Sequence, residues 1–181
     1  MVELDERKFR ELILYLAERS IDDPKFGKTK LAKLLYYSDF YAYALLGRPI
    51  SGATYARYPR GPVPRALARE LNSIEDTQDG VIAKARYHTR EQQRLVALRE
   101  ADLSVFTAAE ISVVDRVIEA LRDHDATDVS ALSHLEAGWK CVQDYADIPY
   151  DLVFVSSDPP SPETVEWAQA FAAEAGLLAS A

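Results

Sequence analysis

The chain has 181 residues, 48% of them hydrophobic, which fits one globular domain with a sizeable core. Its formal net charge of −8 argues against general affinity for nucleic acids, because that binding depends on lysine and arginine neutralising phosphates. Charges interrupt the first 19 residues every few positions, so no signal peptide or membrane span is expected. The single cysteine, Cys141, excludes an internal disulfide and is expected in the core. We therefore predict a cytoplasmic protein without a membrane partner.

The first predicted element is an amphipathic helix over residues 5–19. Hydrophobic residues recur on one of its faces at helical spacing, and the sequence Asp22-Asp23-Pro24 ends it. A longer helix is predicted over residues 29–46, with leucines and alanines along one face. Tyr36, Phe40 and Tyr43 lie almost opposite that face, and Gly47 can stop the helix in a left-handed conformation. A helix that is hydrophobic on both sides is normally packed between partners, so we expect this one at the centre of the domain.

A proline-rich segment, residues 58–64, follows a short extended run over residues 53–57. Its three prolines and one glycine should interrupt both helix and strand and fix a sharp turn. We expect Pro64 at the first position of a helix that continues through residues 66–72. The turn can be a structural element that sets the angle between two helices. It can also be a rigid loop that displays functional side chains, and the two interpretations are compatible.

Residues 81–88 alternate between hydrophobic and polar positions, which predicts a strand, and residues 95–98 are expected to return antiparallel to it. The sequence Thr107-Ala108-Ala109-Glu110 is a capping box and predicts the start of a helix that reaches about residue 122. A shorter helix is predicted over residues 128–136 and an extended run over residues 152–155. Ser161-Pro162-Glu163 should open a last helix, which runs to residue 176.

These elements predict a mainly α fold: a single globular helical domain around a central helix, with a small antiparallel β-hairpin near residues 81–99. We assign residues 1–150 to this domain and residues 151–181 to a C-terminal extension whose terminal helix packs on it. Residues 177–181 are uncharged and should fray. We hypothesise that this tail is a recognition tag for a cytoplasmic ATP-dependent protease.

The sequence offers no set of residues with complementary catalytic roles. The three histidines are far apart and none has a metal-ligand spacing, and Gly27-Lys28-Thr29 lacks the upstream glycine of a phosphate-binding loop. Asp39 could have a shifted pKa if buried, but one carboxylate in an aromatic helix favours a hydrogen-bonded structural group. We therefore predict no enzyme, no cofactor and no metal.

The middle of the chain is strongly basic. Residues 25–69 contain nine lysines and arginines and one acid, Asp39, so this segment carries +8 and the rest of the chain −16. The acidic remainder can fold against it, or an acidic partner can bind it. Tyrosines interleaved with arginines are typical of interface hot spots, although the helical tyrosines favour the core. The predicted partner-binding residues are Lys33, Tyr55, Arg57, Tyr58, Arg60 and Arg65.

Two motifs resemble the Panacea, or SocA-like, antitoxin domain family. The first is KLAKLLYY at residues 30–37 with YPRGPVP at residues 58–64, and the second is LSHLEAGWK at residues 132–140. The resemblance implies an antitoxin that neutralises a cognate toxin by direct binding, with the toxin encoded next to it; some relatives also present the toxin to a protease. The resemblance also implies that six residues of these motifs have a structural role: Gly61, Pro62, Val63, Pro64, His134 and Trp139.

Another class of function uses the same basic segment. A nucleic-acid or nucleotide-binding accessory protein of a phage-defence or mobile element would bind through it, with an affinity that falls steeply with salt. A toxin binder would instead form a saturable complex with a protein. The acidic average charge makes nucleic acid the less favoured partner.

Overall fold

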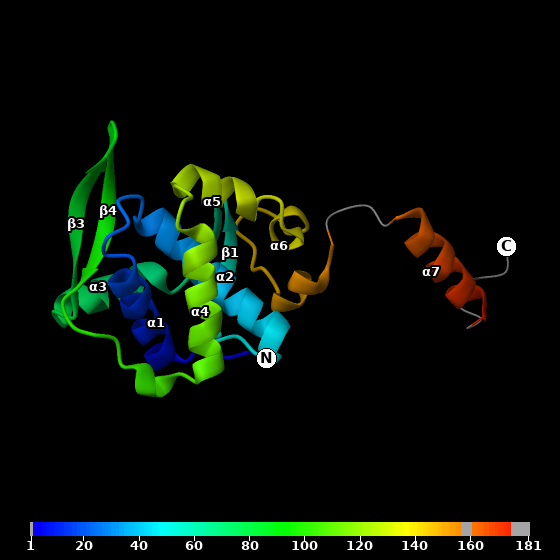
Figure 1. Cartoon of the computed structure of the whole chain (residues 1–181), viewed down its shortest axis with the longest axis horizontal. Helices are drawn as coiled ribbons and strands as arrows, with labels where there is room; N and C mark the ends of the chain where they lie inside the picture. Colours follow the sequence, from blue (N-terminus) through cyan, green and yellow to red (C-terminus); the bar gives the residue numbers. More distant parts are fainter. Residues whose placement is uncertain (1, 157–160, 175–181) are drawn as a thin grey trace.

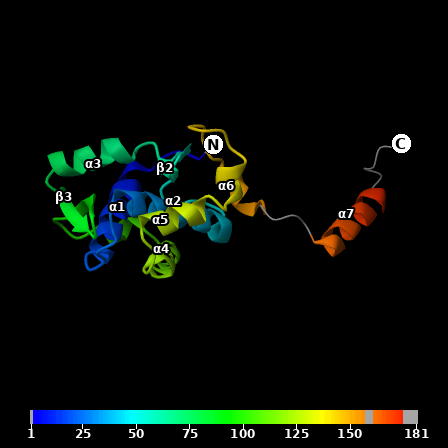
Figure 2. The same ribbon diagram turned by 90° about the horizontal axis from the view of Figure 1, so that it is seen from above.

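The hydrophobic helix in the middle of the chain, α2 (Lys28–Leu46), is the element around which the others pack. The computed structural model describes residues 2–156 and 161–174 (Figure 1). Within these residues α2 contacts α1 (Glu6–Arg19), α4 (Ala108–Leu121), α5 (Ala126–Ser133) and β2 (Gly61–Pro64). Viewed from above, α1 and α2 lie between α3 and β2 on one side and α4 on the other (Figure 2). The predicted central helix and the mainly α fold class are confirmed.

The remaining elements are short. They are β1 (Tyr55–Tyr58), α3 (Leu67–Asp76), β3 (Gly80–Tyr87), β4 (Arg90–Ala97), the 3-10 helix η1 (Leu103–Val105), α6 (Ala137–Lys140), the 3-10 helix η2 (Tyr150–Phe154) and α7 (Pro162–Glu174). In the described residues the strands form two antiparallel hairpins, β1–β2 and β3–β4. The second is the hairpin predicted near residues 81–99, whereas the first was not predicted.

Local signals explain where the helices begin and end. The Asp5 side chain accepts a hydrogen bond from the Lys8 backbone N–H at 2.9 Å and so caps α1. The predicted capping box of α4 is present, with both the Thr107 and Glu110 side chains bonded to backbone N–H groups. Gly47 ends α2 with φ +74°, in the left-handed conformation that glycine adopts readily.

The prediction that the proline-rich segment interrupts a strand was wrong. β2 pairs with β1 antiparallel, with Tyr58 opposite Gly61 and Tyr55 opposite Pro64. Pro64 therefore ends a strand, and α3 starts only at Leu67. The backbone N–H and C=O of Arg57 bond to Ala146 and Tyr145, on the side away from β2.

Arg57 and its partner Pro62 therefore form a pair without ladder hydrogen bonds, in which a missing N–H costs nothing. Pro64, two residues further along β2, shares this orientation, because the Tyr55 carbonyl opposite it accepts from the Ile148 N–H at 2.8 Å. The alternate spacing of the two prolines makes the segment compatible with a strand.

Three smaller expectations also differ from the structure. β4 begins at Arg90, five residues earlier than expected, because its polar side chains bond to the loop between α1 and α2; Gln92, for example, donates to the Pro24 carbonyl. Residues 152–155, expected to be extended, lie mostly in η2. Cys141, which directly follows the short helix α6, is exposed and does not lie in the core.

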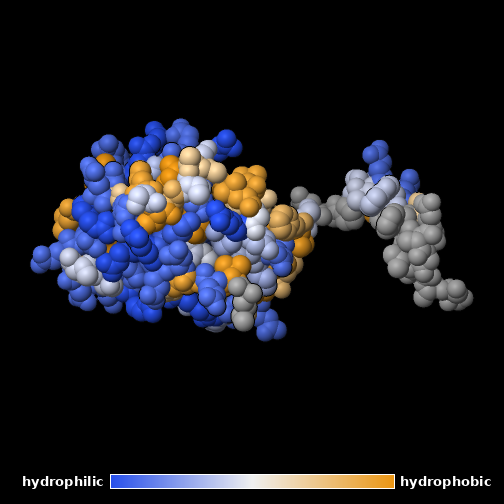
Figure 3. All heavy atoms as spheres, turned by 90° about the horizontal axis from the view of Figure 1, so that it is seen from below, coloured by the Kyte–Doolittle hydropathy of each residue, from blue (hydrophilic) through white to orange (hydrophobic). Residues whose placement is uncertain are grey.

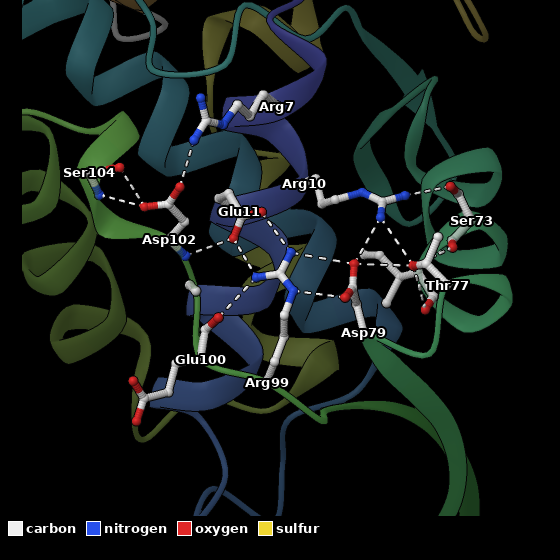
Figure 4. A network of polar contacts seen from close by, with 12 residues as sticks. Arg7, Arg10, Glu11, Ser73, Thr77, Asp79, Arg99, Glu100, Asp102 and Ser104 are labelled. Atoms are coloured by element: carbon white, nitrogen blue, oxygen red, sulfur yellow. Dashed lines mark hydrogen bonds and ion pairs between the residues drawn. The ribbon is translucent and has the colours of Figure 1, made fainter.

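Charged side chains join the β3–β4 hairpin to α1 (Figure 4). The Arg99 guanidinium, just after β4, donates to both carboxylate oxygens of Glu11 on α1, at 2.7 and 2.8 Å. It also donates to Asp79, just before β3, at 2.8 Å. Arg10 extends the network to Asp79 and to Glu70 on α3. This cluster fixes α3 and the hairpin on the same side of α1.

The end of the described chain stands apart. α7 lies away from the other elements (Figure 1). Its Trp167 is exposed. The division into residues 1–150 and 151–181 and the packing of α7 on the domain stay predictions, and residues 177–181 lie outside the described part.

One face of the molecule is largely hydrophilic, with separate hydrophobic patches (Figure 3). No helix among the described residues has the length and hydrophobicity needed to span a membrane.

Candidate protein-binding site

The two sequence motifs, far apart in the chain, meet at the β1–β2 hairpin. Lys33 on α2 donates to the Pro62 carbonyl at 2.9 Å. The Trp139 indole Nε1–H on α6 donates to the Tyr58 carbonyl at 3.2 Å. The hairpin is thus held from α2 on one side and from the segment after α5 on the other.

Lys33 is buried, so its predicted place on an exposed surface was wrong. Its side chain is 0% exposed, and burial lowers its pKa to about 7. Pro62 is the hydrogen-bond partner that the described residues offer to its ammonium group. The sequence alone could not show that Lys33 is buried, because its burial depends on β2, which packs over the face of α2 that carries Lys33.

Tyr55 is the second predicted surface residue that is buried, at 1% exposure. Its hydroxyl donates to the Asp39 carboxylate at 2.7 Å, and the Ser51 backbone N–H donates to the same carboxylate at 2.7 Å. Burial raises the pKa of Asp39, and these hydrogen bonds oppose that rise. Asp39 is the hydrogen-bonded structural group that was predicted, and it fixes the start of β1 to α2.

Gly61 has φ +90° and lies against α2 and α5. A Cβ at this position would be 2.2 Å from Ser133 Oγ and 2.6 Å from Lys33 Cε. Both the positive φ and this close approach require glycine. The glycine lets the hairpin lie directly against Lys33 of α2 and Ser133 at the end of α5.

Arg57 lies within an aromatic and acidic cluster. Its guanidinium carbon is 3.9 Å from the centre of the Trp139 ring, and Trp139 stacks on His134 with ring centres 4.0 Å apart. Arg57 also pairs with Asp144, at 3.3 Å, and donates to the Val142 carbonyl. Burial, together with the positive charges of Lys33 and Arg57, lowers the pKa of His134. Arg57 therefore binds the hairpin to the segment after α6.

The other three predicted partner-binding residues reach the surface. Arg60 is exposed at the tip, and no ion pair joins it to any side chain of residues 2–156 and 161–174. Arg65 is 44% exposed and lies 2.5 Å from Asp147. Tyr58 is half-buried, and its ring packs edge-on against Tyr145 at 5.4 Å.

A groove of about 530 Å³ lies between α2, the hairpin and α3. Its hydrophobic lining includes Ala32, Val63, Leu67, Ala68 and Leu71. Lys28, Arg60 and Arg65 also line it, and none of the described lining residues is acidic. Sequence reasoning missed the contribution of α3, although its buried Leu67, Leu71 and Ile74 have helical spacing that marks a packed face. The described residues include no cluster of metal-binding side chains.

The two motifs that meet at the hairpin lie almost entirely within the part of the chain that matches a known protein family. The family model described as Antitoxin SocA-like, Panacea domain, matches residues 31–140, more than half of the chain. The chain belongs to this family, whose name indicates an antitoxin role and, in general, a toxin as partner. A search of curated proteins finds no match.

Proposed function

We propose that the protein is an antitoxin that neutralises a cognate toxin by binding it directly through the hairpin face, which we define as Tyr58, Pro59, Arg60 and Arg65 with the adjoining groove. One observation carries the proposal: the family motif at residues 58–64 includes an exposed hairpin tip, and the base of the hairpin is fixed by two buried polar residues of α2, Lys33 and Asp39. A rigid base lowers the entropy cost of binding at the tip.

The composition of the hairpin face supports a protein partner. Arginine and tyrosine are enriched among residues that contribute most to protein–protein binding, and a hydrophobic groove with a polar border is typical of interface cores. The positive charges favour an acidic toxin surface, because complementary charge speeds association and selects against wrong partners. We expect the toxin to be the product of a neighbouring reading frame.

Coexpression with that product tests the proposal. The wild-type chain should form a saturable complex and restore growth, and Arg60→Glu should weaken the complex at least ~10-fold, about 1.4 kcal/mol, without a change in melting temperature. Arg57 is left unaltered, because its contacts with Trp139 and Asp144 serve the fold.

The matched control is Arg116→Glu, which makes the same charge change at an exposed position on α4, on the other side of α2 (Figure 2). It should bind as the wild type does. Equal binding by Arg60→Glu and Arg116→Glu would move the interface away from the hairpin face. The absence of both a complex and growth rescue would overturn the antitoxin proposal.

A further inference from the structure

The groove beside the hairpin presents apolar side chains at its surface. Ala32, Leu67 and Leu71 are buried at its floor, while Val63 is half-buried and Ala68 on α3 is exposed. These small or branched side chains come from all three elements that bound the groove, and they form an apolar strip along it. Such a surface gains free energy when a partner's apolar side chains displace water from it.

The edge of β2 disfavours a partner strand in this groove. Strand addition requires alternating backbone donors and acceptors along an open edge. Pro62 and Pro64 supply no N–H, and the Pro62 carbonyl already accepts from Lys33. A helix satisfies its own backbone hydrogen bonds, so it can pack in the groove through its side chains alone.

The positive charges around the groove favour acidic side chains on the helix that binds there, next to its apolar face. Lys28 and Arg60 line the groove, and no carboxylate of the described residues forms an ion pair with either of them. Arg65, on the same border, shares its charge with Asp147. An occupant with aspartates and glutamates beside its apolar stripe would pair with these cations, whereas a basic occupant would be repelled.

We propose that the groove between α2, β2 and α3 binds an acidic amphipathic helix of the toxin. Apolar side chains at helical spacing of i, i+3, i+4 and i+7 enter between Val63 and Ala68, and acidic side chains face Lys28 and Arg60. The assignment of this helix to a toxin rests on the proposed function. The chemistry of the groove can be tested without the toxin.

The probe is a fluorescein-labelled synthetic helix of about 18 residues, with leucine and alanine along one face and glutamate on the other. Fluorescence anisotropy with the full chain should show saturable binding, at least ~10-fold tighter than that of a peptide with lysine in place of every glutamate. Ala68→Trp should fill the groove and weaken binding at least ~10-fold. Because Ala68 is exposed, the melting temperature should not change.

Matched variants separate the groove from general effects. Ala120→Trp makes the same change at an exposed alanine of α4, outside the groove, and should bind the glutamate peptide as the wild type does. Lys28→Glu should weaken binding, while Arg116→Glu, an equal change in net charge, should not. Ala68→Glu provides a second, smaller substitution on α3, which should also weaken binding.

Equal binding by the wild type and both Ala68 variants would overturn the groove proposal, as would equal affinity for the glutamate and lysine peptides. In either case, a complex with the product of the neighbouring reading frame that Arg60→Glu weakens would leave the proposed function standing. Groove-dependent peptide binding without any toxin complex or growth rescue would support the acidic-helix site and overturn the antitoxin function. The two proposals therefore fail separately.

Discussion

Gly61 is a residue at which the hairpin lies close against α2 and α5. Its φ of +90° and the 2.2 Å that would separate an added Cβ from Ser133 Oγ lead us to expect that Gly61→Ala lowers the free energy of unfolding by about 3 kcal/mol. Chemical denaturation monitored by circular dichroism measures the change.

Gly47→Ala is the matched control for this substitution. Gly47 also has a positive φ, +74°, but an added Cβ there would have no neighbour within 4 Å. Only the cost of the left-handed conformation remains, about 1 kcal/mol. Equal losses of stability in the two variants would show that the close contact with Ser133 and Lys33 does not constrain the hairpin.

The burial of Lys33 makes stability depend on pH. Its pKa is lowered from 10.5 to about 7, so between these values the unfolded chain binds a proton that the folded chain does not. The free energy of unfolding should therefore rise with pH in this window, by at most about 1.4 kcal/mol per pH unit from this group. Below about pH 7 both states are protonated, and the full cost of the buried charge remains.

Comparison with Lys33→Met isolates this contribution. The substitution removes the titrating amine and keeps a similar side-chain volume. Between pH 7 and pH 9 the unfolding free energy of the wild type should therefore rise relative to that of the variant. Urea denaturation at several pH values measures it. Parallel curves for the two proteins over this range would contradict the lowered pKa. His134, the titratable neighbour, has its own pKa lowered and so titrates below the window.

At the scale of elements, the Arg99 network holds the β3–β4 hairpin and α3 on α1. Glu11 is buried, and Arg99→Gln would leave its carboxylate without its strongest partner. We expect a loss of about 2 kcal/mol in the free energy of unfolding, less than the ~3–5 kcal/mol for a fully buried pair because Arg99 is partly exposed to solvent. Denaturation at pH 7 measures the change. The Arg99 hydrogen bonds also hold the pKa of Glu11 below its usual 4.5. This contribution is present above pH 4.5 and is lost as pH falls through the lowered pKa.

Arg69→Gln provides the control for Arg99→Gln. Arg69 pairs with Glu6 at 2.8 Å, but both side chains are well exposed, and solvent screens such pairs. Its loss should change stability by no more than about 0.5 kcal/mol. Losses of similar size in the two variants would mean that burial of Glu11 does not strengthen the network.

Across the whole molecule, the acidic remainder of the chain compensates much of the basic middle. Five of its cations pair with carboxylates from outside residues 25–69: Lys30 with Asp23, Arg48 with Glu110, Arg57 with Asp144, Arg65 with Asp147 and Arg69 with Glu6. Lys33 is buried against the hairpin. Lys25 donates to the Asp123 backbone carbonyl, and Lys28 and Arg60 line the groove, where no carboxylate of the described residues pairs with them. These two cations of the basic middle therefore stay available at the groove.

The sequence by itself determined the elements that depend on local interactions. Caps, helical periodicity and Gly47 predicted α1, α2 and α4 closely, because neighbouring residues decide where a helix begins and ends. The hydrophobicity of both sides of α2 also predicted its central position. The two motifs identified the hairpin tip and the Trp139 segment as important without showing that they meet.

Only the tertiary structure decided which candidate residues face a partner. Lys33 is buried under β2, and Tyr55 is buried against the aromatic side chains of α2. Arg57 is bound to Trp139 and Asp144, residues more than 80 positions later. The strand in the proline-rich segment depends on residues 145–148, which bond to β1 from its other side. The groove needs α3 beside α2. Each of these features joins segments distant in sequence, and no local pattern encodes which segments will pack together.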